Sequence, residues 1–166
     1  IEMKKIVPPY VRIKRVMRDI SEHESAAGAS TTNLRQLAKI KMEELGISCQ
    51  CIRCREIGVN YRRAELAELI ITEYEASGGK EFFVSYEDTA NNALLGFLRL
   101  RICNDKAFVR ELHVYGETTP IGEESRQAQH RGLGKKLLAK AEEIASSLGI
   151  SEIAVTSGVG VREYYR

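Results

Sequence analysis

The stretch that decides the fold runs from residue 129 to residue 136 and reads Gln129-His130-Arg131-Gly132-Leu133-Gly134-Lys135-Lys136. It separates a strand-like segment, residues 111–115, from a strongly periodic helical segment. Glycine lacks a Cβ, so the chain can turn sharply here and a ligand can approach the backbone closely. The following helix presents unpaired N–H groups, the positive end of its dipole and two lysines. The stretch predicts a phosphate-binding turn, against the plainer alternative of a glycine turn that only caps a surface helix.

The segments on both sides of this turn predict a mixed α/β (α+β) sheet. Residues 66–76 suit a helix by their Ala, Leu and Glu content, but Ser77-Gly78-Gly79 and the β-branched residues favour a hairpin. Two further strands are expected at residues 94–102 and 107–115, followed by a long polar loop at 116–128. A helix ended by Gly149 is expected at 133–148, a buried parallel strand at 152–157 and a second helix at 158–166. The order is an antiparallel meander followed by strand, glycine turn, helix, strand and helix.

Charge divides the chain into two parts. Residues 1–63 contain 13 Lys and Arg against 7 Asp and Glu, whereas residues 64–166 contain 12 against 16. A basic segment before a slightly acidic domain indicates an anionic partner, with nucleic acid ahead of an anionic membrane, although a solvated mixed surface also explains it. The basic part contains a helix that begins after Thr32 or Asn33 and ends at Gly46. The candidate RNA-binding residues alternate with apolar ones and are Arg12, Lys14, Arg15 and Arg18.

Three of the four cysteines cluster as Cys49, Cys51 and Cys54. No secretory signal opens the chain, so a reducing cytoplasm is expected and a metal is favoured over a disulfide. The spacing predicts a zinc site with thiolate ligands, with free thiols as the alternative. Cys103, His23 or a residue from another part of the protein are candidates for the fourth ligand, although Cys103 ends an apolar strand and suits a buried, inert role.

Length and composition set the remaining limits. A chain of 166 residues that is 43% hydrophobic can form one domain with an appendage. No apolar run approaches the roughly 20 residues of a membrane span, so no membrane partner is expected. The chain starts at Ile1 and ends inside an expected helix, so we expect it to be part of a longer protein.

The strand, the Gln-x-x-Gly-x-Gly turn, the long helix and the parallel strand together resemble the acetyl-CoA site of the GNAT acetyltransferases. The resemblance implies that the turn binds the coenzyme A pyrophosphate and that the preceding strand aligns the pantetheine arm and polarises the thioester carbonyl. It places the cofactor-binding residues at Leu112, His113, Val114, Gln129, His130, Arg131, Gly132, Leu133, Gly134 and Lys135.

In that family a tyrosine on the last helix acts as general acid to the leaving thiolate. The resemblance implies Tyr165 for this catalytic role, with Tyr164 next, and two packing tyrosines are the structural alternative. Glu111 and His113 alternate on one strand and point to one face, as a base, a substrate contact or a structural pair.

A narrower resemblance covers nearly the whole chain. Strings such as ELHVYG and SGVGVREYYR are similar to the catalytic-subunit family of Elongator, the tRNA-uridine acetyltransferases. It implies a C-terminal acetyltransferase half, residues 64–166, behind a basic zinc-binding linker, residues 1–63. The implied reaction uses acetyl-CoA to build a carboxymethyl group on the wobble uridine of tRNA. S-adenosylmethionine and a 4Fe-4S cluster are expected only in a radical-SAM half that this chain lacks.

The same resemblance implies the partners. They are the tRNA anticodon stem-loop, the radical-SAM domain of the same protein and, as a further candidate, a second copy of the chain. The alternative functions are a zinc-stapled RNA-binding module with an inert GNAT fold, or a protein-lysine acetyltransferase. The short turn at residues 77–79 gives the second alternative no support, because GNAT domains usually place one or two helices there to form the acceptor wall.

Overall fold

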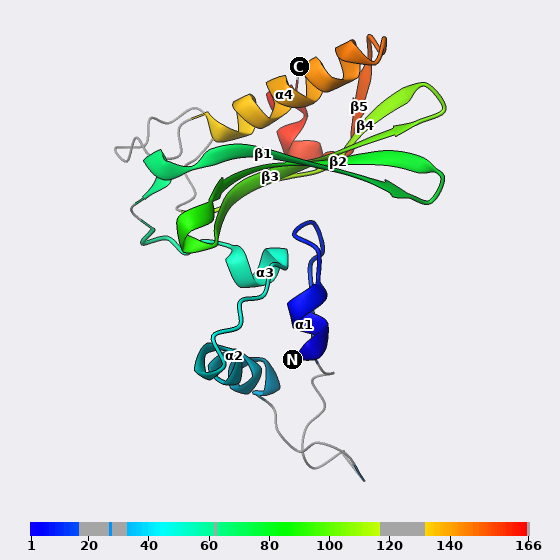
Figure 1. The fold of residues 1–166 in the computed structure, drawn as a ribbon. Coiled ribbons are helices and arrows are strands. Elements are labelled where there is room, and N and C mark those ends of the chain that lie inside the picture. The colour runs from blue at the N-terminus through cyan, green and yellow to red at the C-terminus, as the bar shows by residue number, and fades with distance from the viewer. Residues whose placement is uncertain (17–26, 28–32, 62, 117–131, 166) are drawn as a thin grey trace. The chain divides into compact units, whose positions relative to one another are not determined.

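The protein is described by a computed structural model that covers residues 1–16, 27, 33–61, 63–116 and 132–165. The chain forms two compact units, Ile1–Arg55 and Glu56–Arg166 (Figure 1). In the described parts of the chain, no helix is long and apolar enough to cross a membrane.

The first unit is built from short helices. They are α1 (Glu2–Ile6), α2 (Leu34–Glu44) and α3 (Ile52–Arg55). Helix α2 ends as its sequence predicts, because Gly46 adopts a positive φ of 63° and the Ile47 N–H donates to the Met42 carbonyl at 2.8 Å. Met42, Cys49 and Cys51 form the buried cluster of this unit, with Val7, Ile13 and Ile47 packed against it.

The second unit is a five-stranded sheet in the order β1-β2-β3-β4-β5. The strands are β1 (Glu68–Ala76), β2 (Gly79–Asp88), β3 (Ala93–Cys103), β4 (Lys106–Val114) and β5 (Ile153–Val155). The first four are antiparallel, and β5 pairs parallel to β4. Short 3-10 helices occupy Ala64–Leu66, Thr89–Asn91 and Val159–Tyr165. The predicted mixed α/β sheet is therefore confirmed, and the expected last helix is a 3-10 helix.

Turn chemistry explains the meander. Ser77 and Gly78, between β1 and β2, have φ values of 49° and 70°, and Asn104 and Asp105, between β3 and β4, have φ values of 50° and 56°. Two consecutive residues with positive φ form the two-residue turn whose twist matches antiparallel strands. The hairpin predicted for residues 66–87 is confirmed, so β1 and β2 are joined directly, without intervening helices.

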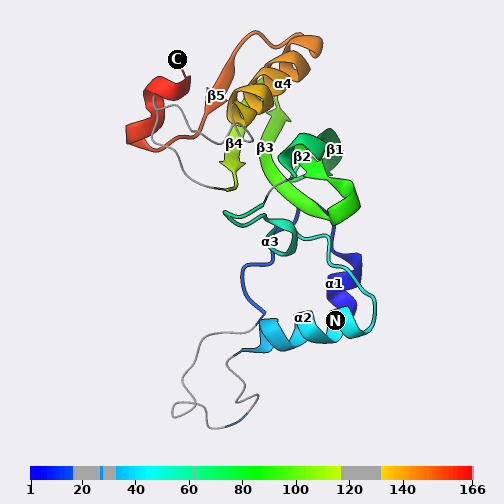
Figure 2. The same ribbon diagram turned by 90° about the vertical axis from the view of Figure 1, so that its left-hand side faces the viewer.

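Helix α4 (Leu133–Ser147) covers one face of the sheet (Figure 2). Leu137, Ala141 and Ala145 fall at helical spacing and are fully buried against apolar side chains of β2, β3 and β4. Those side chains alternate along each strand and are Phe82, Val84, Leu98, Leu100, Ala107 and Val109. The first turn of α4 lies beside β4, because a Cβ added at Gly134 would be 3.7 Å from a Leu112 methyl group.

The opposite face carries charge. Glu81 is 1% exposed, and its Oε1 accepts hydrogen bonds from Arg101 at 2.8 Å and from Arg110 at 2.6 Å. Its Oε2 is buried and has no hydrogen-bond partner among the described residues. Arg101 also donates to the carbonyls of Ala76 and Ser77, so the ion pair ties the β1–β2 turn to β3.

Candidate coenzyme site and cysteine cluster

In the part of the chain that the structure describes, no side chain caps the N-terminus of α4. Gly132 is the N-cap residue, with φ 78°, and its carbonyl accepts the Lys136 N–H at 2.9 Å. The amides of Leu133, Gly134 and Lys135 have no acceptor within the helix, because the first turn of any helix leaves them free. Lys135 and Lys136 are exposed beside them. This end of α4 therefore offers oriented N–H groups and positive charge to an anion. The predicted contacts Gln129, His130 and Arg131 lie outside the described residues.

Strand β4 has an open edge near this helix end. Strand β5 pairs only with Ala107–Val109, and in the described chain no strand pairs with the rest of β4 on that side. A bulge at Arg110 separates the two halves of β4, because Val109 faces Leu100 while Glu111 faces Arg99. The pairing of β5 with β4 ends before the bulge, so the β4 backbone beyond Arg110 has an edge that a ligand can reach.

The register shows which peptide groups line this edge. The Tyr115 N–H donates to the Leu95 carbonyl at 2.8 Å. Hydrogen-bonded pairs alternate in an antiparallel ladder, so the peptide groups of His113 point toward β3 and those of Leu112 and Val114 point away from it. The open edge is therefore formed by Leu112 and Val114.

The two candidate tyrosines occupy different surroundings. A Cβ added to Gly134 would lie 2.5 Å from the Tyr164 hydroxyl oxygen and 3.7 Å from a Leu112 methyl group. Tyr164 thus rests against the first turn of α4 and beside β4, and burial raises the pKa of its hydroxyl. Tyr165 contacts Tyr164 edge to face at 5.0 Å and lines a pocket of about 370 Å³ between α4 and β5. Tyr164 is the one that reaches the predicted coenzyme turn.

Glu111 and His113 point to the sheet face opposite α4, as their alternation predicts. The Arg99 Nε donates to the Glu111 carboxylate at 3.0 Å, and the His113 ring stacks on Phe97 at 6.1 Å. Arg99 is a further polar residue on this face, and its alternation with Phe97 and Arg101 along the strand is the sequence signal that points to it.

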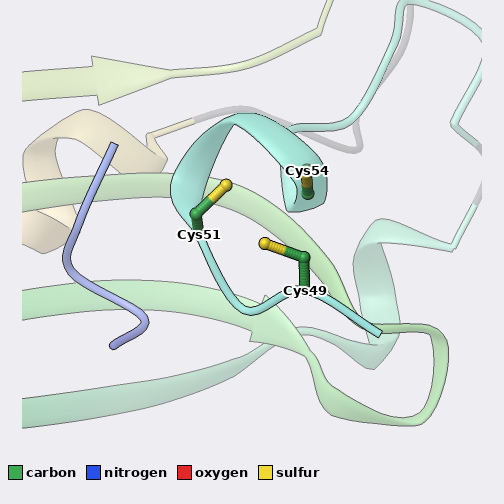
Figure 3. A group of neighbouring side chains, drawn as sticks. All are labelled: Cys49, Cys51 and Cys54. Carbon is green, nitrogen blue, oxygen red and sulfur yellow. The ribbon is translucent and has the colours of Figure 1, made fainter. Parts of the chain in front are cut away.

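The three cysteines come together in the first unit. All three sulfur atoms lie within 4.8 Å of one another, and the side chains of Cys49 and Cys51 point toward each other (Figure 3). Cys54 belongs to α3, and its N–H donates to the Cys51 carbonyl at 3.0 Å. The Arg55 side chain holds the loop that contains Cys49 and Cys51, because it donates hydrogen bonds to the carbonyls of Gln50 and Pro9. The spacing of the cysteines therefore closes into one sulfur cluster.

A buried lysine lies at this cluster. The Lys4 Nζ is 3.2 Å from the Cys54 sulfur and 3.9 Å from the Cys49 sulfur, and Lys4 is 7% exposed. Burial raises the pKa of Cys49 to about 11. Burial opposes ionisation of Cys51 too, but hydrogen bonds from Cys49 and Cys54 outweigh it and lower the pKa of Cys51. The Lys4 ammonium group is therefore close enough to the sulfur atoms to balance the negative charge of a thiolate.

The remaining predicted residues differ in their surroundings. Cys103 lies in the second unit, where its thiol is 3.9 Å from the Gly78 carbonyl, and His23 is outside the described residues. Lys14 and Arg15 are exposed and Arg12 is half-buried, in a segment without regular structure. Arg18 also lies outside the described residues.

The fold and the glycine turn define the class of protein. A profile of the Acetyltransferase (GNAT) family matches residues 48–166, and the chain belongs to this family.

Comparison with individual proteins shows a subgroup within this family. The chain is 45% identical, over 98% of its length, to the tRNA uridine(34) acetyltransferase of Methanocaldococcus jannaschii, and 44% identical, over 97%, to Elongator complex protein 3 of Schizosaccharomyces pombe. It covers 34% and 33% of those proteins, so it spans about a third of the length of the curated relatives. The solved Elp3 of Methanocaldococcus infernus, with an N-terminal deletion, matches 98% of this chain at 43% identity and a TM-score of 0.81, with 42% of that chain covered. The resemblance to the Elongator catalytic-subunit family is confirmed.

Proposed function

We propose that residues 56–166 bind acetyl-CoA and supply the acetyl-transfer site of a tRNA-modifying enzyme. The observation that carries the proposal is the uncapped N-terminus of α4 beside the open edge of β4. The amides of Leu133, Gly134 and Lys135 would hold the pyrophosphate, and the peptide groups of Leu112 and Val114 would align the pantetheine arm. A peptide N–H of that edge would also stabilise charge on the thioester oxygen.

Tyr164 is our choice for the general acid. Its hydroxyl lies against Gly134 and beside Leu112. A phenol is protonated at neutral pH, and burial raises the pKa of Tyr164 further, so a proton is present to be given to a leaving thiolate. We expect Tyr164→Phe to lower tRNA-stimulated hydrolysis of acetyl-CoA by the full-length enzyme about 100-fold. Tyr165→Phe is the matched control and should change the rate less than threefold. The reverse order would transfer the role to Tyr165, and two unchanged rates would remove both tyrosines from the chemistry.

The phosphate assignment is tested by charge reversal on one helix. Lys135→Glu and Lys140→Glu change the net charge equally, but only Lys135 lies in the first turn of α4. We expect the first variant to weaken acetyl-CoA binding at least tenfold in calorimetry and the second to change it less than twofold. Gly134→Glu should also abolish binding, because it adds bulk and negative charge at the free amides. Equal affinities for all variants would contradict the assignment.

The full reaction extends beyond this chain. Relatives named tRNA uridine(34) acetyltransferase support the wobble uridine as acceptor. We propose a 5-carboxymethyl group on that uridine as the product. S-adenosylmethionine and a 4Fe-4S cluster would be bound outside residues 1–166. Direct joining of β1 to β2 leaves no helical wall for a peptide, which disfavours a lysine acceptor. The test is mass spectrometry of tRNA from cells that carry the Tyr164→Phe enzyme, with loss of the modified uridine expected.

We also propose that Cys49, Cys51 and Cys54 bind zinc. Zinc–sulfur bonds of about 2.3 Å place tetrahedral sulfur ligands about 3.8 Å apart, which the cluster can reach with small shifts. Zinc would tie the start of α3 to the preceding loop. One zinc per chain is expected by elemental analysis, falling below about 0.1 in Cys51→Ser, whereas Cys103→Ser should retain it.

The basic segment would contact tRNA phosphates. Lys14 and Arg15 are exposed there, and each lost phosphate contact should lower the log–log salt slope of binding by about 0.7–0.9. Alanine at positions 12, 14, 15 and 18 together should therefore flatten the salt dependence. An unchanged slope would place the tRNA contacts elsewhere.

A further inference from the structure

The three thiols of the sulfur cluster differ in their access to solvent. Cys49 and Cys51 are 5% and 0% exposed, whereas Cys54 is an exposed residue. All three sulfur atoms nevertheless lie within 4.8 Å of one another. A reagent in solution can therefore reach one sulfur that has two buried sulfurs close to it. An accessible thiol next to a second thiol is the arrangement of redox-sensing cysteines.

The backbone places Cys51 and Cys54 in a geometry that suits a disulfide. The Cys54 N–H donates to the Cys51 carbonyl at 3.0 Å, which closes a turn between these two residues. The Cα atoms at the two ends of such a turn lie less than about 7 Å apart, and a disulfide needs a Cα separation of about 4.4–6.8 Å. The sulfur atoms can therefore be joined by rotation of the two side chains, without a change in the turn.

A positive charge lies beside the exposed sulfur. The Lys4 Nζ is 3.2 Å from the Cys54 sulfur, and Lys4 is buried. Sulfur carries negative charge when it attacks an electrophile, and a neighbouring cation stabilises that charge. The fourth cysteine, Cys103, lies in the second unit, which contains no other cysteine. The first unit is therefore the place in this chain where one thiol can react and a second can follow.

We propose that Cys54 is an oxidation site for peroxides and that Cys51 converts the oxidised product into a disulfide. The Cys54 sulfur attacks one oxygen of hydrogen peroxide, the O–O bond breaks, and the other oxygen takes up a proton and leaves as water. The Cys51 sulfur then attacks the Cys54 sulfenic acid, forms the S–S bond and releases a second water. The two thiols lose two electrons, and hydrogen peroxide is the oxidant that gains them.

The disulfide would remove two of the three thiolates from the proposed zinc site. Cys49 alone would remain, whereas a structural zinc site uses four ligands, so zinc would be released. This consequence rests on the proposed zinc binding, while the disulfide itself rests on the geometry of the sulfur atoms. Thiol reductants would restore both thiols by exchange. The first unit would therefore bind zinc under reducing conditions and release it under oxidising conditions.

Peptide mapping after treatment with hydrogen peroxide tests the disulfide directly. Trypsin cuts after Arg53, so Cys49 and Cys51 fall in one peptide and Cys54 falls in the next. A Cys51–Cys54 disulfide therefore links two peptides, whereas a Cys49–Cys51 disulfide stays within one. We expect the linked peptides, with fragmentation assigning the bond to Cys51, and their separation after dithiothreitol. An internal Cys49–Cys51 disulfide alone, or oxidation of Cys54 that never gives the link, would overturn the proposal.

Serine variants provide matched controls. Cys51→Ser should abolish the link and leave a Cys54 sulfenic acid that dimedone labels. Cys103→Ser should give the same yield of linked peptides as the wild type, within about twofold, because its thiol has no partner thiol in its unit. A link that persists in Cys51→Ser and disappears in Cys49→Ser would overturn the assignment to Cys51.

Zinc release is the second readout, followed with a colorimetric chelator. We expect about one zinc ion released for each pair of linked peptides, and no release when dithiothreitol is present. Linked peptides with the zinc retained would overturn the coupling between the disulfide and the metal. Reduced protein that contains no zinc would instead refute the proposed zinc site, while the peptide map would still decide whether Cys54 and Cys51 form the disulfide.

Discussion

The contact between Gly134 and Tyr164 leads to a quantitative prediction about a double-mutant cycle. In a helix, Gly→Ala stabilises by about 0.5–1 kcal/mol, because glycine loses more backbone freedom on folding. At Gly134, however, the new methyl group would lie 2.5 Å from the Tyr164 hydroxyl oxygen, about 1 Å closer than ordinary contact. Overpacking of this kind costs about 1–3 kcal/mol. The single variant Gly134→Ala should therefore leave stability unchanged or lower it by up to about 2.5 kcal/mol.

Removing the hydroxyl should reverse the sign. In Tyr164→Phe, the nearest remaining ring atom is the Cζ carbon, 3.6 Å from the new methyl group, which is an ordinary van der Waals distance. Gly134→Ala in that background should then show the full helix gain of about 0.5–1 kcal/mol. The coupling energy between the two sites is expected to be about 1–3 kcal/mol.

Urea denaturation of the four proteins, followed by circular dichroism, measures this coupling. Independent sites add within about 0.3–0.5 kcal/mol, so a coupling below about 0.5 kcal/mol would refute the placement of the Tyr164 hydroxyl on Gly134. Gly134→Ala paired with Tyr165→Phe is the matched control, because the atoms nearest to the added methyl group belong to Tyr164 and Leu112 and not to Tyr165. That pair should be additive.

Three further predictions concern the rest of the chain. Burial and the hydrogen bond to Asp88 raise the pKa of Tyr61 to about 12. The stability that this group contributes is therefore complete below pH 10 and is lost as pH rises from 10 toward 12. Tyr61→Phe should flatten that part of a pH profile of urea stability, and an unchanged profile would contradict the shift. Glu81→Gln removes a buried charge that binds two arginines and should lower the free energy of unfolding by about 1–3 kcal/mol. Glu73→Gln, in a half-exposed pair, should change the free energy of unfolding in urea by less than about 0.5 kcal/mol. Equal effects of the two variants would argue against burial of the Glu81 pairs. Lys4→Met removes the cation beside the sulfur cluster and should weaken zinc binding several-fold in a chelator competition. Lys5→Met, whose lysine pairs with Glu2, is the control and should leave zinc binding unchanged. Unaltered zinc affinity in both variants would show that Lys4 does not contribute to the site.

Local sequence was sufficient for most of the fold. The strands were predictable because their apolar residues alternate and their turns contain residues that tolerate positive φ, as at Ser77 and Gly78. Helix α4 was predictable because its apolar stripe lies between two glycines. In both cases the information lies within a few residues, at the range over which backbone preferences act.

Local sequence was not sufficient for the geometry of the candidate site. The bulge at Arg110 adds one residue to β4, which inverts the alternation of every later side chain. The inversion puts Leu112 on the α4 face and His113 on the opposite face of the sheet. It arises from pairing between two strands, so the sequence of β4 alone does not show it.

The sequence by itself determined the class of the protein: the order of strands and helices, the glycine turn at the start of α4, and three cysteines close enough to form one cluster. Only the tertiary structure decided which tyrosine meets Gly134, that Lys4 reaches a sulfur cluster 45 and 50 residues away, and that Glu81 is buried between two arginines. The physical reason is range. Backbone propensities and turn chemistry act between neighbours, whereas these contacts depend on strand register and on packing between distant segments, which exist only once the sheet has formed.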